Sequence, residues 1–399
     1  MDRSAKKERF PLGHEITLEE LDRDPYPAFA RLRLREPISW LPALDMWYVV
    51  GYENVRDALL DSARLTTASP QSTIYDTFGE QVLTSEGAAH DRYRQAASRP
   101  FAPAAIRTHL EAAIQETAAA LISGFEVRGQ VDLRPAFAAR LPVHVMLLLC
   151  GLPAGAEACM RRWYDSFEAA LANFSHDPAI RETARQSVAE FHALLDTQLE
   201  SLDDRGGSLL AHLARAPQRF CNEEIKRNLS NIFFGGISTV EALLLNCLWA
   251  LFEHPQCLDR VRRDPALIPQ VIEETMRWLS PVQSATRHVT AAFEWRGIEF
   301  AAHDTVNCML GAANRDPAIF AEPDRFDLDR PNSRRHLGFA TGSHACLGLH
   351  LAKAEARIAL EMLLGRLDSL TLERSLTLPP SGNEFRQSRR LTVRWSPRR

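Results

Sequence analysis

The chain has 399 residues, of which 45% are hydrophobic and 25% charged, and this composition is typical of a globular protein with a large buried core. Its formal net charge of −4 gives no electrostatic case for nucleic acid, so we expect no nucleic-acid partner. The seven cysteines are odd in number and scattered, which argues against a disulfide framework or a zinc site and favours a reducing, cytoplasmic location.

The N-terminal segment, MDRSAKKERFPLGHE, lacks the apolar core of a secretion signal. The longest apolar runs, near 141–153 and 242–252, are shorter than the roughly 18 residues that indicate a membrane span. The sequence therefore predicts a protein that does not insert into a membrane.

Helical periodicity dominates the chain. Apolar residues recur three and four positions apart in four long segments, which predicts a mainly α protein. The predicted helices are Pro103–Ile122, Pro178–Leu202, Glu223–Phe252 and Leu347–Leu367.

One region has the alternation of strands. Thr286–Leu310 contains the short runs FEW and IEF, separated by Arg296-Gly297 as a hairpin turn. A small sheet is predicted there, beside the helical bulk. Length alone would suggest two or three domains, but no repeat or flexible linker interrupts the chain, so residues 1–399 are interpreted as a single domain and a monomer.

The stretch HLGFATGSHACLGLH, residues 336–350, places Cys346 between Gly342 and Gly348 at the start of a predicted helix. Unpaired backbone N–H groups at a helix start favour a thiolate, lower its pKa and suit it to bind a metal. The glycines would leave room for a flat group. Taken alone, the cysteine could equally be a buried structural residue, because free cysteines are often buried.

The order and spacing of Phe339, Gly342, His344, Cys346 and Gly348 resemble the haem-binding loop of the cytochrome P450 family. The resemblance implies the cytochrome P450 fold, haem b (heme, iron protoporphyrin IX) as cofactor, and the Cys346 thiolate as the iron ligand. It extends over 24–395, nearly the whole chain. Two positions depart from the family pattern: Ala340 stands where glycine is usual, and Lys353 where arginine is common.

Haem propionates need cationic or hydrogen-bonding partners. His90 and Arg94, in HDRYR, are four residues apart and share a helical face. By themselves they indicate only a solvated basic face, but they resemble the propionate-binding pair of the family. Arg287 and His344 match two further positions with this role.

Glu274 and Arg277, in EETMR, lie three apart on a predicted helix, where Glu273 could pair with Arg277 equally well. An exposed pair would contribute little to stability. The resemblance favours Glu274 and Arg277 as a structural pair behind the haem loop, joined by Arg325 from the PDRF segment.

In NIFFGGISTVEALLLN, Gly235 and Gly236 interrupt a strongly apolar helix. Close helix packing is one explanation; a groove for oxygen and substrate is the other. The segment resembles the family's oxygen-binding helix, which assigns catalytic roles to Thr239 and to Ser238, although Ser238 stands where the family usually has an acid.

This departure matters because a serine can relay a proton but cannot supply one at neutral pH. Ser238 could pass protons from water to Thr239, Glu241 could substitute although it should face away from Thr239, or a polar group of the substrate could complete the relay. A fourth possibility is that hydrogen peroxide is the oxidant.

The resemblance implies a bacterial-type monooxygenase that inserts one atom of O2 into a small organic substrate. The chain has no flavin, nicotinamide or iron–sulfur motif, so electrons would come from a ferredoxin or flavodoxin. Residues expected to line the pocket predict an apolar or aromatic substrate with some polar anchoring. A peroxygenase and a non-catalytic haem sensor are the alternatives.

Overall fold

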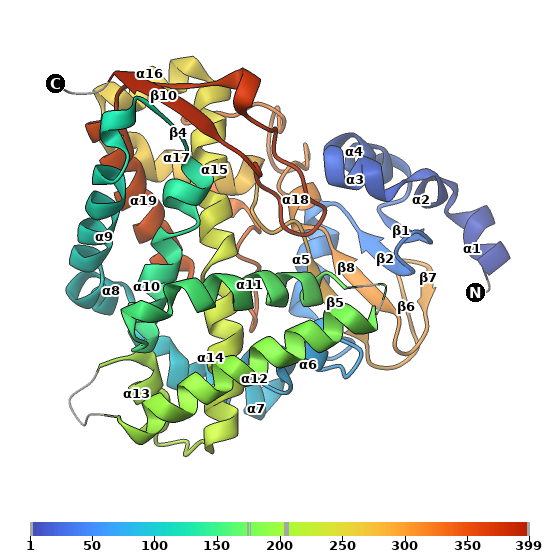
Figure 1. Ribbon diagram of the computed structural model, residues 1–399. Coiled ribbons are helices and arrows are strands. Elements are labelled where there is room, and N and C mark those ends of the chain that lie inside the picture. The colour runs from blue at the N-terminus through green and yellow to red at the C-terminus, as the bar shows by residue number, and fades with distance from the viewer. Residues whose placement is uncertain (1–2, 174, 176, 203–206, 397–399) are drawn as a thin grey trace.

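Helices form the larger part of the molecule, and a smaller β-rich region lies beside them (Figure 1). The computed structural model describes residues 3–173, 175, 177–202 and 207–396. Its α-helices are α1 (Arg3–Arg9), α2 (Pro11–Glu15), α3 (Leu18–Arg23), α4 (Tyr26–Arg35), α5 (Tyr52–Leu60), α6 (Thr73–Phe78), α7 (Gly87–Ser98), α8 (Pro103–His109), α9 (Glu111–Ser123), α10 (Leu141–Cys150), α11 (Glu157–Leu171), α12 (Pro178–Glu200), α13 (Leu209–Ala214), α14 (Asn222–Gly235), α15 (Ser238–Glu253), α16 (Pro255–Arg263), α17 (Ile268–Trp278), α18 (Leu310–Ala313) and α19 (Leu349–Arg366).

The four predicted helices are all present, and two of them are broken. The predicted segments 178–202 and 347–367 correspond to α12 and α19. The segment 103–122 divides into α8 and α9 at Leu110, and the segment 223–252 divides into α14 and α15. Apolar periodicity continues across both breaks, because the same face of each pair packs on the core, so periodicity alone could not locate them.

Within the described residues, ten strands form three sheets. They are β1 (Ile38–Leu41), β2 (Met46–Val49), β3 (Leu65–Thr66), β4 (Gln130–Asp132), β5 (Ala285–Val289), β6 (Phe293–Trp295), β7 (Ile298–Phe300), β8 (Thr305–Cys308), β9 (Asp368–Leu372) and β10 (Thr392–Ser396). The largest sheet has the order β1-β2-β8-β5-β3, and its β2–β8 pair is parallel. The second sheet has the order β4-β10-β9.

The predicted hairpin is confirmed as the two-stranded β6–β7 sheet. Arg296 and Gly297 form its turn with φ angles of 52° and 75°. Two consecutive residues with positive φ are the signature of the tight turn that matches the twist of a hairpin.

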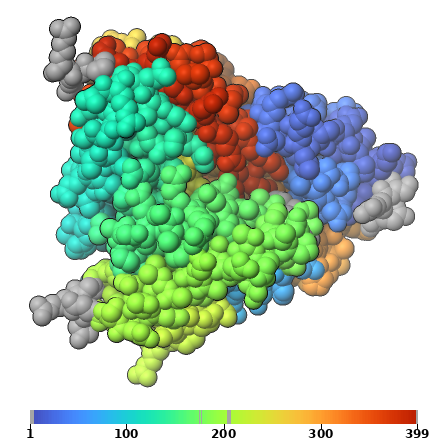
Figure 2. Space-filling model, viewed as in Figure 1, coloured from blue at the N-terminus to red at the C-terminus, as the bar shows by residue number. Residues whose placement is uncertain are grey.

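The main core lies among the helices, and α15 runs through it with nearly every side chain buried. Together α14 and α15 are long and apolar enough to cross a membrane, but 78% of their most apolar window is buried inside the protein, as in the core helix of a globular protein. In the space-filling view, the green helices α11 and α12 cover one face, and the red C-terminal segment meets the blue N-terminal part (Figure 2).

Candidate functional site

A cavity of about 620 Å³ lies between the α14–α15 break and the loop that precedes α19. Cys346 and Gly348 line it from the loop, and Gly235 and Thr239 line it from the helices. The structure therefore brings the two motifs, about 100 residues apart in the chain, to one cavity. It also brings six further predicted residues there: Gly236, His90, Arg94, Arg287, Phe339 and His344.

The loop around Cys346 is held by its own backbone. The Cys346 N–H donates to the Phe339 carbonyl at 2.9 Å, and the Ala345 N–H donates to the Gly342 carbonyl at 3.1 Å. Gly342 has a φ of 79°, and a Cβ there would lie 3.2 Å from the Leu59 carbonyl oxygen. Glycine is thus required at 342 by both conformation and contact. A Cβ at Gly348 would meet only Phe101, at 4.0 Å. No close contact with the described residues therefore requires glycine at 348.

The prediction that the pKa of the Cys346 thiol is lowered is wrong for the chain by itself. Burial raises the pKa of Cys346, while the N–H groups of Gly348 and Leu349 and the nearby Arg94 act in the opposite direction. The helix start therefore offers the expected donors, but desolvation outweighs them. A thiolate at this position needs a cation such as a metal ion to be stable.

Ala340, the departure from the family pattern, has a φ of 54°. This left-handed conformation costs a residue with a side chain about 1–2 kcal/mol and costs glycine almost nothing. The backbone conformation at position 340 thus explains why glycine is usual there in the family, and alanine at this position is strained.

We expect Ala340→Gly to raise the free energy of unfolding by about 1 kcal/mol, because it removes this strain. Urea unfolding measures the change. Ala345→Gly is the control, since Ala345 is not among the residues with positive φ; there, glycine should destabilise by about 0.5–1 kcal/mol through the unfolded state. Equal effects of the two substitutions would contradict the argument.

The histidines and arginines predicted for haem propionates lie around the cavity. His90 is buried on α7, its ring 4.6 Å from that of His344, and its Nε2 has no partner among the described residues. Burial lowers the pKa of both Arg94 and Arg287, and neither arginine makes an ion pair within the described part of the chain. A buried cation without an anion is costly.

These donors fit the carboxylates of haem. Buried Arg287, half-buried Arg94 and the unpaired imidazole nitrogen of His90 would each gain a partner from propionate oxygens. His344 is only partly available, since its Nε2 already lies 3.0 Å from Glu86 Oε2 and 3.2 Å from Thr67 Oγ1. Although burial opposes it, the hydrogen bonds from His344 and Thr67 lower the pKa of Glu86 to about 2.

The predicted pair of Glu274 and Arg277 is fully buried on α17. Arg277 donates from Nη2 to Glu274 Oε1 at 2.7 Å and from Nε to Oε2 at 2.8 Å, and the two side chains are 0% and 1% exposed. The second possibility, Glu273 with Arg277, is not realised. Glu273 instead accepts from Lys353 at 2.6 Å and pairs with His336 at 3.1 Å.

The prediction that the Arg325 side chain joins this pair is wrong. Its side chain is 62% exposed, and only its carbonyl takes part, accepting from Arg277 at 2.8 Å. Arg330 is the third member: its Nε donates to Glu274 Oε1 at 3.0 Å. The turn at 322–325 directs the Arg325 carbonyl inward, which places its side chain on the surface.

Glu273 links α17 to the haem loop and to α19, and its pKa predicts a pH dependence. Burial opposes ionisation, but His336 and Lys353 lower the pKa of Glu273 to about 2, below its ordinary value. The stabilising contribution of the ionised Glu273 carboxylate is therefore present at neutral pH. It is lost as the pH falls from the ordinary pKa of 4.5 towards the lowered pKa of about 2.

We expect Glu273→Gln to lower the free energy of unfolding by about 1–2 kcal/mol at pH 7 and by progressively less below about pH 5. Urea unfolding of both proteins across this range measures the difference. A difference that grows on acidification would contradict the assignment. Glu111→Gln, which removes a surface partner of Arg357, serves as a matched control with a smaller effect.

The glycine pair at the helix break has two separate uses. A Cβ on Gly236 would lie 2.4 Å from Met146 Sδ, whereas a Cβ on Gly235 would have nothing within 4 Å. Gly236 thus allows α10 to approach, and Gly235 opens the helix to the cavity. Close helix packing therefore explains Gly236, and a groove at the cavity explains Gly235. Thr239 donates to the Gly235 carbonyl at 2.7 Å and also lines the cavity.

Ser238 is buried on α15 and is not among the residues that line the cavity. It lies beside Tyr164 of α11: Ser238 acts to lower the pKa of Tyr164, although burial raises that pKa well above its ordinary value. The Tyr164 hydroxyl donates to Glu168 Oε2 at 2.7 Å. Glu241 is bound to Arg134 at 2.7 Å, away from Thr239 as expected.

Sequence reasoning missed three carboxylates. Glu86 contacts the haem loop through His344, Glu355 of α19 is fully buried with both oxygens unpartnered in the described structure, and Glu384 lines the cavity. Glu355 sits among apolar residues at helical spacing after Cys346, which was a usable signal. Glu384 follows Gly382-Asn383 in a loop, where a carboxylate is ordinarily exposed.

Comparisons with known proteins agree with this geometry. The family model Cytochrome P450 matches residues 173–385. The chain is 32% identical over 365 residues to Cytochrome P450 monooxygenase PikC of Streptomyces venezuelae, covering 88% of this chain and 85% of PikC. It is 29% identical to 6-deoxyerythronolide B hydroxylase of Saccharopolyspora erythraea, covering 88% and 90%.

A solved structure of P450BioI, in complex with an acyl carrier protein ligated with hexadec-9Z-enoic acid, superposes with a TM-score of 0.85 at 28% identity, covering 95% of this chain and 99% of that one. CalO2 superposes with a TM-score of 0.86, also at 28% identity, covering 96% and 98%. Sequence and structure therefore agree that this chain belongs to the cytochrome P450 family, as a haem-containing monooxygenase of bacterial type.

Proposed function

We propose that this enzyme uses Cys346 as its haem-iron ligand and the Thr239 hydroxyl to pass protons into the cavity, and oxidises a small apolar or aromatic substrate. The observation that carries the proposal is the shared cavity: the cysteine loop and the α14–α15 break line one space, with unpaired arginines at its edge. When bound, haem with a thiolate ligand supplies the cleavage of the O–O bond.

The chain's own residues would hold the cofactor and keep its surroundings dry. His90, Arg94 and Arg287 would bind the propionates, with His344 as a further donor held by Glu86. Phe339 lines the cavity beside the loop. The network of Glu274, Arg277 and Arg330 would fix the segment that precedes this loop.

The substrate side of the cavity is largely apolar. Leu243, Val282, Phe234 and Phe385 line it, and the rings of Phe234 and Phe385 are 6.0 Å apart. Phe233, the neighbour of Phe234, is fully buried against Phe191 and does not line the cavity. These side chains support an apolar or aromatic substrate.

A proton relay from Ser238 to Thr239 would need a bridging water, because Ser238 does not line the cavity that Thr239 lines and adjacent residues of a helix do not face each other. The structure favours water or a substrate group as the source, because Glu241 is engaged by Arg134. Tyr164 and Glu168 lie on the far side of Ser238 and would connect it towards the surface. Unchanged coupling of electron use to product in Ser238→Asp would count against a special role for this serine.

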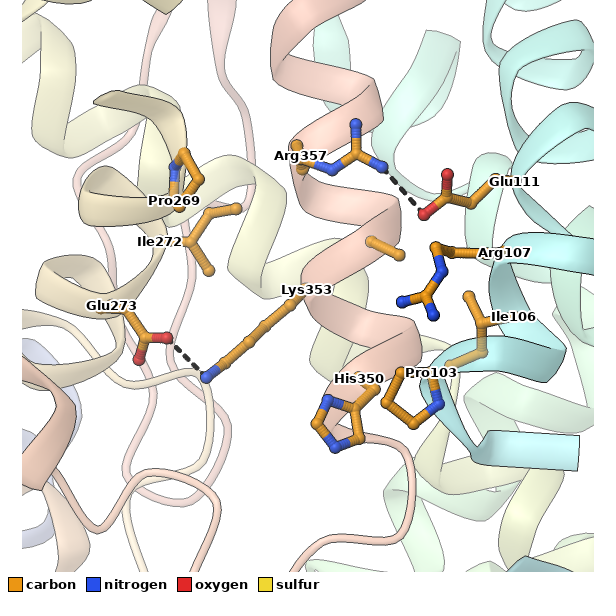
Figure 3. A pocket seen from close by; sticks show the side chains of 11 residues that line it. Pro103, Ile106, Arg107, Glu111, Pro269, Ile272, Glu273, His350, Lys353 and Arg357 are labelled. Carbon is orange, nitrogen blue, oxygen red and sulfur yellow. Dashed lines mark hydrogen bonds and ion pairs between the residues drawn. The ribbon is translucent and has the colours of Figure 1, made fainter. Parts of the chain in front are cut away.

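Electrons would come from a ferredoxin or flavodoxin that docks near the outer face of α8, α17 and α19. A pocket of about 220 Å³ lies there, and Figure 3 shows the side chains that line it. The nearby cations Lys353 and Arg357 are paired with Glu273 and Glu111. Arg92 is paired with Glu224.

The basic face for an acidic carrier therefore reduces to exposed arginines, namely Arg99, Arg107, Arg334 and Arg335. Reversing the charge of Arg99, Arg334 and Arg335 together should slow reduction at low salt by about tenfold. Arg31→Glu, on α4, is the control. An unchanged reduction rate would show that these arginines do not form the docking face.

One experiment separates the main candidates. The haem-loaded protein is reduced under carbon monoxide to record the thiolate band, and turnover of aromatic test substrates is then compared with a ferredoxin system and with hydrogen peroxide alone. The proposal requires the band and ferredoxin-dependent product. Product from peroxide alone would favour a peroxygenase, and a band without product from either oxidant would favour a sensor.

We further propose that residues 1–399 act as one domain, as a monomer in the cytoplasm. Strand β2 contributes to both the second and the third core cluster, and the loop at 337–340 packs against both the first and the second. The relatives are bacterial enzymes matched over nearly their whole length. Sedimentation of the haem-loaded protein would test the monomer.

A further inference from the structure

Glu384 occupies a fixed position at the cavity wall. Its carbonyl accepts from the Gln283 N–H at 2.9 Å, and the neighbouring Phe385 forms an antiparallel bridge with Val282. The loop that carries Glu384 is thus tied to the segment before β5, which also lines the cavity. The position of the carboxylate is set by backbone bonds on both sides.

Neutral donors hold the carboxylate itself. Ser284 Oγ donates to Oε2, and Asn307 Nδ2 donates to Oε1 at 3.0 Å. Thr286 Oγ1 donates in turn to the side-chain oxygen Oδ1 of Asn307 at 3.2 Å. This bond orients the Asn307 side-chain amide so that its NH2 group faces Glu384. Each carboxylate oxygen has a further lone pair to offer.

No cation of the described structure pairs with Glu384. The ion pairs within 4 Å in this part of the chain involve other carboxylates. Burial raises the pKa of Glu384 against the effect of Ser284 and Asn307. His288, the nearby titratable group of β5, is itself neutral at pH 7, because burial and Arg287 lower its pKa to about 4.

The other charged side chains at the cavity have different uses. Arg94, Arg287 and His90 suit the haem carboxylates, as argued above, Asp45 is exposed at the rim, and Glu355 lines the cavity from α19, the helix that follows the cysteine loop. Unlike Glu355, whose oxygens have no partner among the described residues, Glu384 is an ionisable carboxyl group that has its hydrogen bonds already in place and lacks a counter-ion in the described part of the chain. A carboxylate in such surroundings gains most from a cation.

We propose that Glu384 is a specificity-determining residue that binds a cationic nitrogen of the substrate, so that the preferred substrate is an apolar or aromatic molecule carrying a protonated amine or a quaternary ammonium group. This rests on the proposed function and narrows its substrate class. The apolar side chains opposite would hold the hydrocarbon part, and the Glu384 carboxylate would fix its charged end.

A structural role alone would not need a charge. Glutamine at 384 could still accept from Asn307 with its side-chain oxygen and donate to the Ser284 hydroxyl with its NH2 group, and it could hold the same loop. Glu384→Gln therefore removes the charge while keeping the shape, and it separates charge recognition from loop support. Asp45→Asn is the matched control, because it removes a second carboxylate from the cavity rim.

The test uses pairs of probes that differ only in charge. Benzoylcholine is compared with 3,3-dimethylbutyl benzoate, in which carbon replaces the nitrogen, and two longer pairs carry biphenyl and naphthyl groups in place of phenyl. A quaternary nitrogen has no lone pair and cannot ligate the iron. Binding to the haem-loaded full chain is measured by calorimetry, after the carbon monoxide band has been recorded.

We expect at least one cationic probe to bind about tenfold more tightly than its neutral partner, and Glu384→Gln to remove that preference without weakening the neutral probe. Asp45→Asn should keep the preference. The proposal is overturned if no pair shows a preference, if Asp45→Asn and not Glu384→Gln removes it, or if both probes weaken equally in Glu384→Gln. Absence of the thiolate band would overturn the proposed function and not the role of Glu384. The charge preference is measured by calorimetry, which does not depend on the band.

Discussion

Replacing Cys346 with serine is expected to abolish the red-shifted band of the reduced, carbon monoxide-bound protein and all oxygen-dependent turnover. A serine hydroxyl stays protonated and donates far less electron density to iron than a thiolate does. The substitution is nearly isosteric, and the loop is held by backbone bonds from Cys346 to Phe339 and from Ala345 to Gly342. The fold should therefore survive, and the loss should be chemical.

The absorption spectrum and product analysis measure this effect. Cys159→Ser is the matched control, since Cys159 is also a partly buried free cysteine but lies on α11, outside the cavity. It should leave band and turnover unchanged. If the Cys346→Ser protein retained the band, the Cys346 sulfur would not be the iron ligand.

Replacing Glu274 with glutamine is expected to lower the free energy of unfolding by about 3–5 kcal/mol. The change leaves Arg277 and Arg330 buried with less compensation, and a buried charge without its partner is far more costly than an exposed one. The Glu274 side chain is 1% exposed, so water cannot replace the lost interaction. Urea unfolding followed by circular dichroism measures the change.

The control is Glu322→Gln, which removes the exposed carboxylate nearest to Arg325 and should change stability by less than about 1 kcal/mol. The same assay distinguishes the two arginines. Arg330→Ala should destabilise strongly, whereas Arg325→Ala should have little effect because only its carbonyl contacts Arg277. A larger effect for Arg325→Ala would contradict the corrected assignment.

The family, the mainly α fold and the convergence of the motifs on one cavity could be predicted because each depends on spacing along the chain. The Cys346 loop, the α17 pair and the α14–α15 glycines are short motifs whose residue types carry their own physical reasons. The β6–β7 hairpin was equally predictable, because two residues with positive φ suffice to define its turn.

What could not be predicted depends on partners distant in sequence. Arg325 and Arg330 are both near the PDRF segment, and only the path of the turn decides which side chain reaches Glu274. The thiol pKa of Cys346 depends on desolvation by surrounding segments. Glu384 is unremarkable in the sequence, because its burial comes from β5 and β8 folding over it.

The contact between Glu86 and His344 joins residues 258 positions apart, and His344 lines the cavity. The ribosome releases a bacterial chain from its N-terminus onward, so α7 and its arginine exist well before the cysteine loop is made. With Cys346 as the proposed ligand, haem capture would therefore wait until almost the whole polypeptide has been synthesised. Truncated products that end before Cys346 would lack this ligand.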